Sequence, residues 1–208
     1  VSPGQMSIAQ AHTALRALDR TPSVRWRARQ IFASGLAAAA VAGLWRLPWL
    51  DMATAGLIGV IIGVLGELIA RRPKMKEASD AISALVAGFV AILVANFIAP
   101  LNLYTVIIAS LIVLVPGMAL TNAVNELTSQ HLVSGVARLA GALATVLKLT
   151  VGSMIAVTLA QLLGLYPDVR ASRPQPEWVE WSAMIVAAYA FAVLFKAHRR
   201  DYFWVMAA

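Results

Sequence analysis

The chain contains six long apolar runs separated by short polar segments, and this alternation constrains its fold more than any other feature. A helix needs about 20 predominantly apolar residues to cross the hydrocarbon core of a bilayer. In lipid every backbone N–H and C=O group must be paired inside the protein, which an α-helix achieves within one segment. The pattern predicts an all-α, polytopic membrane protein with about six transmembrane helices, at approximately residues 30–47, 52–70, 78–99, 103–123, 139–163 and 178–195.

The composition agrees with this class of protein. The chain is 60% hydrophobic and 13% charged, whereas a soluble domain is typically ~25% charged. A net charge of +7 can indicate a nucleic-acid-binding protein, but here the basic residues fall in short segments between the apolar runs. That distribution is the one described by the positive-inside rule. We therefore expect the lipid bilayer, and no nucleic acid, as the partner.

The basic residues also predict the orientation of the chain. With both ends inside, thirteen of the seventeen Lys and Arg residues fall in inner segments, three in outer loops, and Lys148 within a span. Because positive charge accumulates on the cytoplasmic side, this bias predicts an N-in, C-in topology. The inner residues are Arg16, Arg20, Arg25, Arg27, Arg29, Arg71, Arg72, Lys74, Lys76, Arg138, Lys196, Arg199 and Arg200, and the outer ones are Arg46, Arg170 and Arg173.

Local patterns predict a capped helix before the first run and close packing in the second. In the polar segment 1–29, Ser7 can cap a short cytoplasmic amphipathic helix. In the second run, Asp51 can cap the helix, and small residues recur every four positions, including Gly59 and Gly63. This small-xxx-small spacing lets two helix backbones approach closely.

The fourth run is interrupted. Residues 107–115 are apolar, Pro116–Gly117 follows, and a polar stretch then carries Asn122 and Glu126. Proline removes a backbone donor and clashes with the preceding turn, and glycine adds conformational freedom. In hydrocarbon, such a break is tolerated only where protein or a water-filled cavity covers the freed carbonyls. The run therefore predicts a helix bent or unwound at this point. A simple kink and the broken helix of a transporter are both compatible with it.

Lys148 lies near the centre of the fifth run, where a charged side chain costs roughly 2.5–3.5 kcal/mol on insertion scales. We expect its ammonium group to face protein or a cavity, with Glu126, Glu67 or the carbonyls freed at Pro116 as its partner. Glu67 can instead pair with Arg71, one helical turn away. Lys148 is thus either a substrate- or proton-coupling residue or a structural charge satisfied by a neighbouring helix.

Asn122 and Glu126 are four residues apart, so they share a helix face just beyond the break. Partial burial would raise the pKa of the Glu126 carboxyl and allow it to bind and release a proton. The alternative is an exposed acid at the cytoplasmic end of the helix. Arg138 stands where the fifth run meets the inner surface, and it either snorkels to that surface or pairs with Glu126.

The sequence offers little for an enzyme or a metal centre. Cysteine is absent, and the three histidines are far apart along the chain. The apolar runs offer little for chemistry beyond Glu67, Asn96, Lys148 and Gln161. A membrane-embedded hydrolase requires a nucleophile–base or metal-ligand constellation at membrane depth, and these residues do not form one. We expect no enzymatic activity, no cofactor and no metal.

Several motifs around the break resemble the threonine/serine exporter family. They are Leu114-Val115-Pro116-Gly117, Leu120-Thr121-Asn122-Ala123, Glu126-Leu127 and Leu132-Val133-Ser134-Gly135-Val136-Ala137-Arg138. The resemblance covers about residues 1–165, and most family members carry Asp where Glu126 stands. We expect a cytoplasmic amphipathic segment (1–29), a five-helix membrane domain (30–165), an external loop (166–177) and the start of a second membrane repeat (178–208), as in fused members of the family.

The resemblance implies export of threonine and serine from the bacterial cytoplasm across the inner membrane, driven by the proton gradient. Split relatives are associated with dicarboxylate export, so a dicarboxylate exporter subunit and a non-transporting scaffold stay as alternatives. The implied partners are a small polar substrate and protons, while a homo-oligomer or a partner membrane repeat is left open. The candidate substrate- or proton-coupling residues are Pro116, Gly117, Asn122, Glu126, Arg138 and Lys148.

Overall fold

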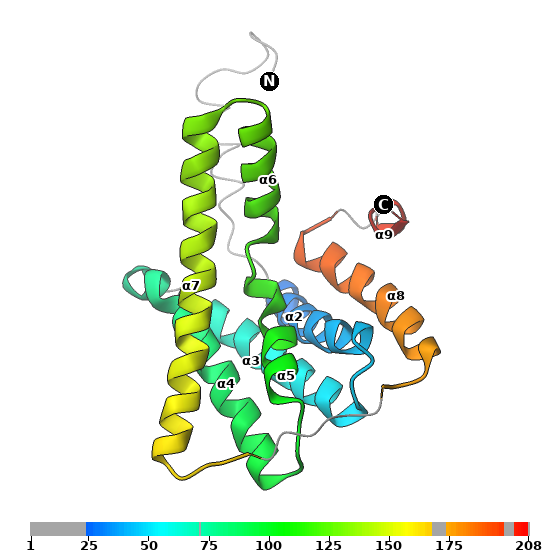
Figure 1. The fold of residues 1–208 in the computed structure, drawn as a ribbon. Coiled ribbons are helices and arrows are strands. Elements are labelled where there is room, and N and C mark those ends of the chain that lie inside the picture. Colours follow the sequence, from blue (N-terminus) through cyan, green and yellow to red (C-terminus); the bar gives the residue numbers. More distant parts are fainter. Residues whose placement is uncertain (1–23, 71, 168–173, 198–201, 208) are drawn as a thin grey trace.

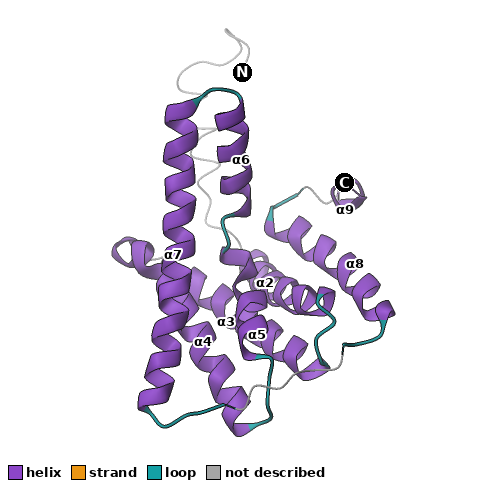
Figure 2. Ribbon diagram, viewed as in Figure 1, coloured by secondary structure: helices purple, strands orange, loops and turns teal. Residues whose placement is uncertain are grey.

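The computed structural model describes residues 24–70, 72–167, 174–197 and 202–207 (Figure 1). Within these residues the chain is helical and contains no strand (Figure 2), which confirms the predicted all-α class. The short helix predicted at Ser7 lies outside the described residues. The elements are α2 (Val24–Leu44), α3 (Trp49–Ala70), η1 (Pro73–Ala78), α4 (Ser79–Phe97), α5 (Leu103–Leu111), η2 (Ile112–Leu114), α6 (Gly117–Thr128), α7 (Leu132–Leu162), α8 (Glu177–Leu194) and α9 (Tyr202–Ala207).

Four described helices, α3, α4, α7 and α8, are long and apolar enough to cross a membrane. The bent unit formed by α5, η2 and α6 makes a fifth if it counts as one span. The polytopic class is therefore confirmed, with four or five such spans instead of six. The predicted span that does not meet this criterion is the first one, which corresponds to α2. Its first turns carry three arginines, and its apolar part is mostly alanine and glycine, which add little hydropathy per residue.

The small residues of the second run bring α2 and α3 into close contact, as the sequence predicted. A Cβ built on Gly59 would lie 2.8 Å from both the Ser34 carbonyl oxygen and the Ala38 Cβ. The Ser34 hydroxyl donates a hydrogen bond of 2.8 Å to the carbonyl of Gly59. Side chains larger than hydrogen would separate these backbones, so Gly59 is required by the packing and implies no ligand.

Asp51 does not act as the predicted cap. It lies inside the first turn of α3, is 2% exposed, and accepts hydrogen bonds from Asn102 in the turn between α4 and α5. The helix begins three residues earlier than predicted, at Trp49, because Pro48 is well suited to the start of a helix and the apolar Trp49–Leu50 pair continues the run. The carboxylate therefore joins two separate turns of the chain.

The 31 residues of α7 make it the longest described helix, about 46 Å at 1.5 Å per residue. Its C-terminal half packs on α4, where a Cβ on Gly152 would lie 2.9 Å from that of Ala84. Its N-terminal half packs antiparallel to α6, where Gly135 lies against Leu127. In Figure 1 this α6–α7 hairpin extends beyond the ends of the other helices, so α7 connects the helix bundle to the segment that follows the break.

The α2–α3 contact can be tested with two glycines of the same helix. We expect Gly59→Ala to lower the free energy of unfolding by about 1–3 kcal/mol, because the added methyl group overpacks the interface. Gly66→Ala adds the same atom where no neighbour lies within 4 Å, so it should be neutral or slightly stabilising. Thermal unfolding of the purified protein in detergent measures both, and equal effects of the two variants would contradict the packing role.

Candidate functional site

The predicted helix break is present, and it separates two helices at an angle. α5 ends at Leu111, a single 3₁₀ turn follows over η2, and α6 starts at Gly117, bent by 65° from the preceding segment. Pro116 has no N–H, and the N–H of Gly117 bonds to the carbonyl of Val115 at 2.8 Å instead of to Val113, its regular α-helical partner. The carbonyl of Val113 thus loses its helical donor.

A cavity of about 440 Å³ lies beside the break. One wall is the unwound segment with the first turn of α6, and the other is the C-terminal end of α8, which contributes Phe191, Leu194 and Phe195. The side chains around it are apolar, so polar interactions with a ligand there would come from the backbone of the break. The sequence did not indicate that these α8 residues would line a cavity at the break, because they come from a distant and uniformly apolar run.

The structure explains the proline of the break but gives no reason for the glycine that follows it. Pro116 explains the interruption, since it cannot donate to the helix. Gly117 is the first residue of α6, its φ is not positive, and a Cβ there would meet nothing within 4 Å. Neither backbone conformation nor packing within the described residues requires a glycine at this position.

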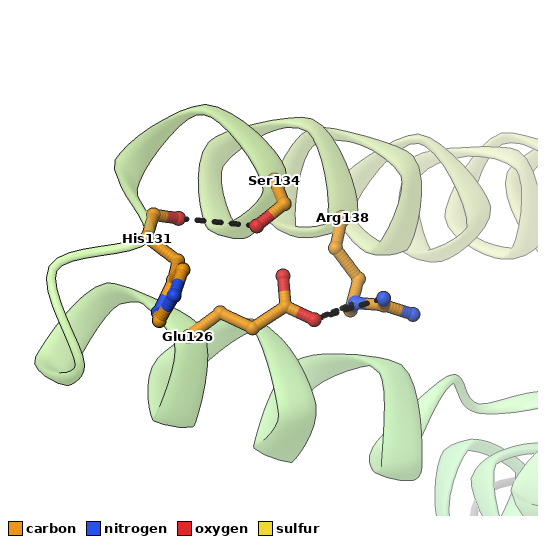
Figure 3. A network of polar contacts seen from close by, with 4 residues as sticks. All are labelled: Glu126, His131, Ser134 and Arg138. Atoms are coloured by element: carbon orange, nitrogen blue, oxygen red, sulfur yellow. Dashed lines mark hydrogen bonds and ion pairs between the residues drawn. The ribbon is translucent and has the colours of Figure 1, made fainter.

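An ion pair joins α6 to α7 beyond the break (Figure 3). Arg138 donates from Nε at 3.0 Å and from Nη2 at 2.9 Å, both to Oε1 of Glu126. The side chains are 46% and 27% exposed, respectively. The sequence left two alternatives for Arg138, snorkelling to the inner surface or pairing with Glu126. The structure shows the pairing. The pair brings together residues twelve positions apart because the α6–α7 turn, with Gln130 at a φ of 63°, reverses the chain.

The second oxygen of Glu126 is in a different situation. Oε2 is buried and accepts no hydrogen bond within the described residues. The Ser134 hydroxyl points toward the carboxylate in Figure 3, yet its proton goes to the carbonyl of His131 at 3.2 Å. A hydroxyl has one proton and rotates freely, so Ser134 can bond either oxygen acceptor. The sequence did not single out Ser134 or His131, although Ser134 lies in the motif that ends at Arg138 and His131 directly precedes that motif.

The pKa of the Glu126 carboxyl is lowered, chiefly because the hydrogen bonds from Arg138 stabilise its charged form. The Ser134 hydroxyl acts in the same direction when it turns to the carboxylate, and the partial burial of the group opposes both without reversing them. The expectation that burial raises this pKa is therefore wrong for this conformation. Glu126 lies near the end of α6, on the hairpin that extends beyond the other helices in Figure 1.

The other two candidate residues have no such partners. The side chain of Asn122 is exposed and, within the described part of the chain, forms no hydrogen bond. Lys148 is half-buried, and no ion pair or hydrogen bond to it is found among the described residues. Of its three predicted partners, Glu67, Glu126 and the carbonyls freed at Pro116, Glu126 is bound to Arg138 instead. The pairing predicted between Glu67 and Arg71 involves a residue outside the described ones.

The position of Lys148 is nevertheless informative. One helical turn further along α7, Gly152 contacts Ala81 and Ala84 of α4. Residues four apart share a helix face, so Lys148 lies at the edge of the α4–α7 interface, near the start of α4. No group of three or more His, Asp, Glu or Cys side chains able to hold a metal occurs in the described residues.

The model of a family described as "Putative threonine/serine exporter" matches residues 1–160. This chain belongs to that family. The match includes the break, the α6–α7 hairpin and most of α7, and it ends before α8. The family is one of transporters and not a class of enzymes. No curated protein and no solved structure matches the chain.

The lowered pKa of Glu126 leads to a test by titration. A group whose pKa is depressed in the folded state contributes stability above its ordinary pKa of ~4.3, and that contribution is lost as the pH falls through the lowered value. The ion pair should therefore persist at neutral pH and disappear only in acid. Arg138→Gln should raise the pKa of the Glu126 carboxyl.

Infrared titration of the carboxylate band measures this shift, with a Glu126→Gln sample subtracted to isolate the Glu126 signal. Arg72→Gln, which removes an equal charge from an exposed position after α3, serves as the control and should leave the titration unchanged. An identical titration in wild type and Arg138→Gln would show that the ion pair does not set the pKa of this carboxyl.

Proposed function

We propose that this chain forms the membrane part of a proton-coupled secondary exporter of small hydroxy amino acids, threonine and serine, in the bacterial inner membrane. We place both ends inside, a topology in which α2 also crosses the membrane, in addition to α3, α4, the bent α5–α6 unit, α7 and α8. The observation that carries the proposal is the Glu126–Arg138 ion pair, which lies on the helix hairpin directly after a broken membrane helix. Membership of the exporter family supports the transport class and the kind of substrate. The proton coupling and the residues below are our own assignments.

The break supplies a place for a polar substrate. In transporters, unwound backbone at a broken helix coordinates substrate groups that lipid would reject. Here the carbonyl of Val113 loses its helical donor, and the adjacent cavity of about 440 Å³ has room for a small amino acid. We assign Pro116, Gly117 and Asn122 to this region: the proline opens the backbone, and Asn122 offers an amide one turn into α6.

The ion pair supplies the coupling. In the conformation described, Glu126 is charged, its Oε1 is held by Arg138, and its Oε2 has no partner. If the hairpin opens, Arg138 leaves and the pKa of the carboxyl rises, so the group takes up a proton. The two conformations then differ in proton affinity, which is the condition for coupling.

Lys148 and the last membrane helix complete the assignment. The ammonium of Lys148 has no carboxylate partner within the described residues, so it is available to a substrate carboxylate or, once Arg138 has moved, to Glu126. α8 packs against α2 and lies beyond the family match. We assign residues 178–208 to the start of a second membrane repeat, which would cover the exposed apolar side chains of the α6–α7 hairpin.

Replacing Glu126 tests the coupling. Glu126→Gln keeps the size of the side chain and its hydrogen bonding but removes its titration, so export should lose its dependence on the proton gradient while the protein remains folded. Glu126→Asp keeps the acid and should stay active. Flux of threonine and serine from proteoliposomes, with and without an imposed proton gradient, measures both variants.

Each alternative to this function predicts a different result in the same assay. A scaffold gives no flux of any substrate, and a dicarboxylate exporter subunit moves dicarboxylates but not threonine. Normal pH dependence in Glu126→Gln would place the coupling at another residue and leave Glu126 as a cap of the cytoplasmic end.

Lys148 is tested by charge removal. Lys148→Ala should reduce export at least about tenfold, the factor that corresponds to loss of one interaction of ~1.4 kcal/mol, while membrane insertion is retained. Thr150→Ala, two residues away and exposed on the same helix, is the matched control and should export normally. Unchanged export in Lys148→Ala would reduce Lys148 to a packing residue.

A further inference from the structure

A groove of about 340 Å³ runs along α2, between α3 and α8. Where they line this groove, α2 and α3 approach closely through small residues: a Cβ built on Gly56 would lie 3.1 Å from that of Ala39. Larger side chains from the three helices, such as Leu36, Val60 and Tyr189, complete the lining. We call this feature the α2–α8 groove.

The α2–α8 groove has the length and the chemistry that suit a hydrocarbon chain. Its α2 side extends from Arg29 to Ala39, about 15 Å along a helix, which is half of the ~30 Å hydrocarbon core of a bilayer. Apart from Arg29 and the hydroxyl of Tyr189, the lining side chains are apolar, and Phe32 and Leu36 among them are exposed. An unfilled groove loses dispersion contacts, so in a membrane an acyl chain is its expected occupant.

One end of the groove carries a positive charge with hydrogen-bond donors to spare. Arg29 donates from Nη2 to the hydroxyl of Tyr202 at 2.9 Å. Its Nε is buried without an acceptor, and no carboxylate pairs with it, among the residues that the structure describes. A guanidinium has five N–H donors, and a hydroxyl that accepts a bond keeps its own proton for another acceptor. The Arg29–Tyr202 pair therefore favours an additional acceptor, and a negatively charged one.

A second cation lies at the same end. Lys196, which follows α8, lies over the ring of Trp26, with its Nζ 5.1 Å from the ring centroid. Trp26 and Arg29 are three residues apart and so are neighbours on α2. The amide of Gln30 donates to the carbonyl of Val193 at 2.9 Å and holds the two helices together there. On the proposed topology this end meets the inner surface, where basic pockets between membrane helices bind anionic lipid head groups.

We propose that the α2–α8 groove binds one anionic phospholipid, with an acyl chain along the groove and the phosphate at Arg29. The guanidinium donates to the phosphate oxygens, a pairing that suits its planar shape, and the Tyr202 hydroxyl adds a further donor. A zwitterionic lipid also carries a phosphate, but its cationic head group is repelled by Lys196 and the arginines of α2. The inference requires a chain that lies in a membrane, and it does not depend on export.

Lipid binding to the whole purified protein, stripped of lipid in detergent, tests the groove. Native mass spectrometry compares phosphatidylglycerol, which is anionic, with phosphatidylcholine, which is zwitterionic, at the same acyl chains. We expect one phosphatidylglycerol per chain, with a Kd at least about tenfold lower than that of phosphatidylcholine. Arg29→Gln should weaken the binding of phosphatidylglycerol about tenfold or more, because a hydrogen bond between charged groups contributes at least that factor.

Matched variants separate the site from general effects of charge and size. Arg72→Gln removes the same charge from an exposed residue that does not line the groove, and it should bind like wild type. Ala39→Phe places a ring in the groove and should weaken binding, whereas Ala144→Phe, at an exposed position of α7, should not. Thermal unfolding without lipid shows which variants are folded, and if Ala39→Phe is not, the comparison of Arg29→Gln with Arg72→Gln decides alone.

Four results would overturn the proposal. The first is equal affinity of wild type for the two lipids, and the second is an equal loss in Arg29→Gln and Arg72→Gln, which would reflect overall positive charge. The third is thermal protection by inorganic phosphate equal to that by phosphatidylglycerol, which would show a phosphate site without a lipid groove. The fourth is a dimer without bound lipid, in which a second copy covers the groove. The expected binding without threonine flux would leave the lipid site intact and remove only the proposed export function.

Discussion

The requirement that every backbone polar group in lipid find a partner governs this structure. Helices meet it along most of the described chain. At Pro116, inside the fourth apolar run, the helix is interrupted, and the neighbouring elements accommodate this break. The chain bends there by 65°, a cavity forms against α8, and the polar part of the fourth run is carried away from the bundle on the α6–α7 hairpin. The ion pair between Glu126 and Arg138 exists because the break allows α6 to fold back along α7.

Close packing in other parts of the fold makes the break at Pro116 tolerable. α2 and α3 approach through Gly59, and α4 meets α7 through Gly152. These contacts use backbone and small side chains, which fit together in one arrangement, whereas the cavity at the break is lined by large, adaptable ones such as Met118 and Phe191. The rigid contacts and the adaptable ones are thus separated in space.

Much of this arrangement could be predicted from the sequence, and the reasons for success and failure are physical. Apolar length located the helices, because the bilayer thickness is fixed, and proline located the break. The small-residue spacing around Gly59 gave an interface. Contacts between residues far apart in the sequence were harder to predict. The pairing of Arg138 with Glu126 was one of two alternatives, and it lowers the pKa of Glu126, which burial was expected to raise. The same pairing occupies one of the partners expected for Lys148. Asp51 was read as a local cap, since nothing in the sequence reveals that Asn102 lies beside it.

The length of α7 has a mechanical consequence. The helix is held by α4 at Gly152 and carries Arg138 fourteen residues away, a distance of about 21 Å along a straight helix. It therefore behaves as a lever with its pivot inside the bundle. A tilt of about 10° at the pivot displaces the far end by roughly 4 Å on such a helix, more than the 2.9 Å between the charged atoms of Arg138 and Glu126. If α6 stays in place, a small tilt at Gly152 is therefore enough to break a salt bridge two nanometres away.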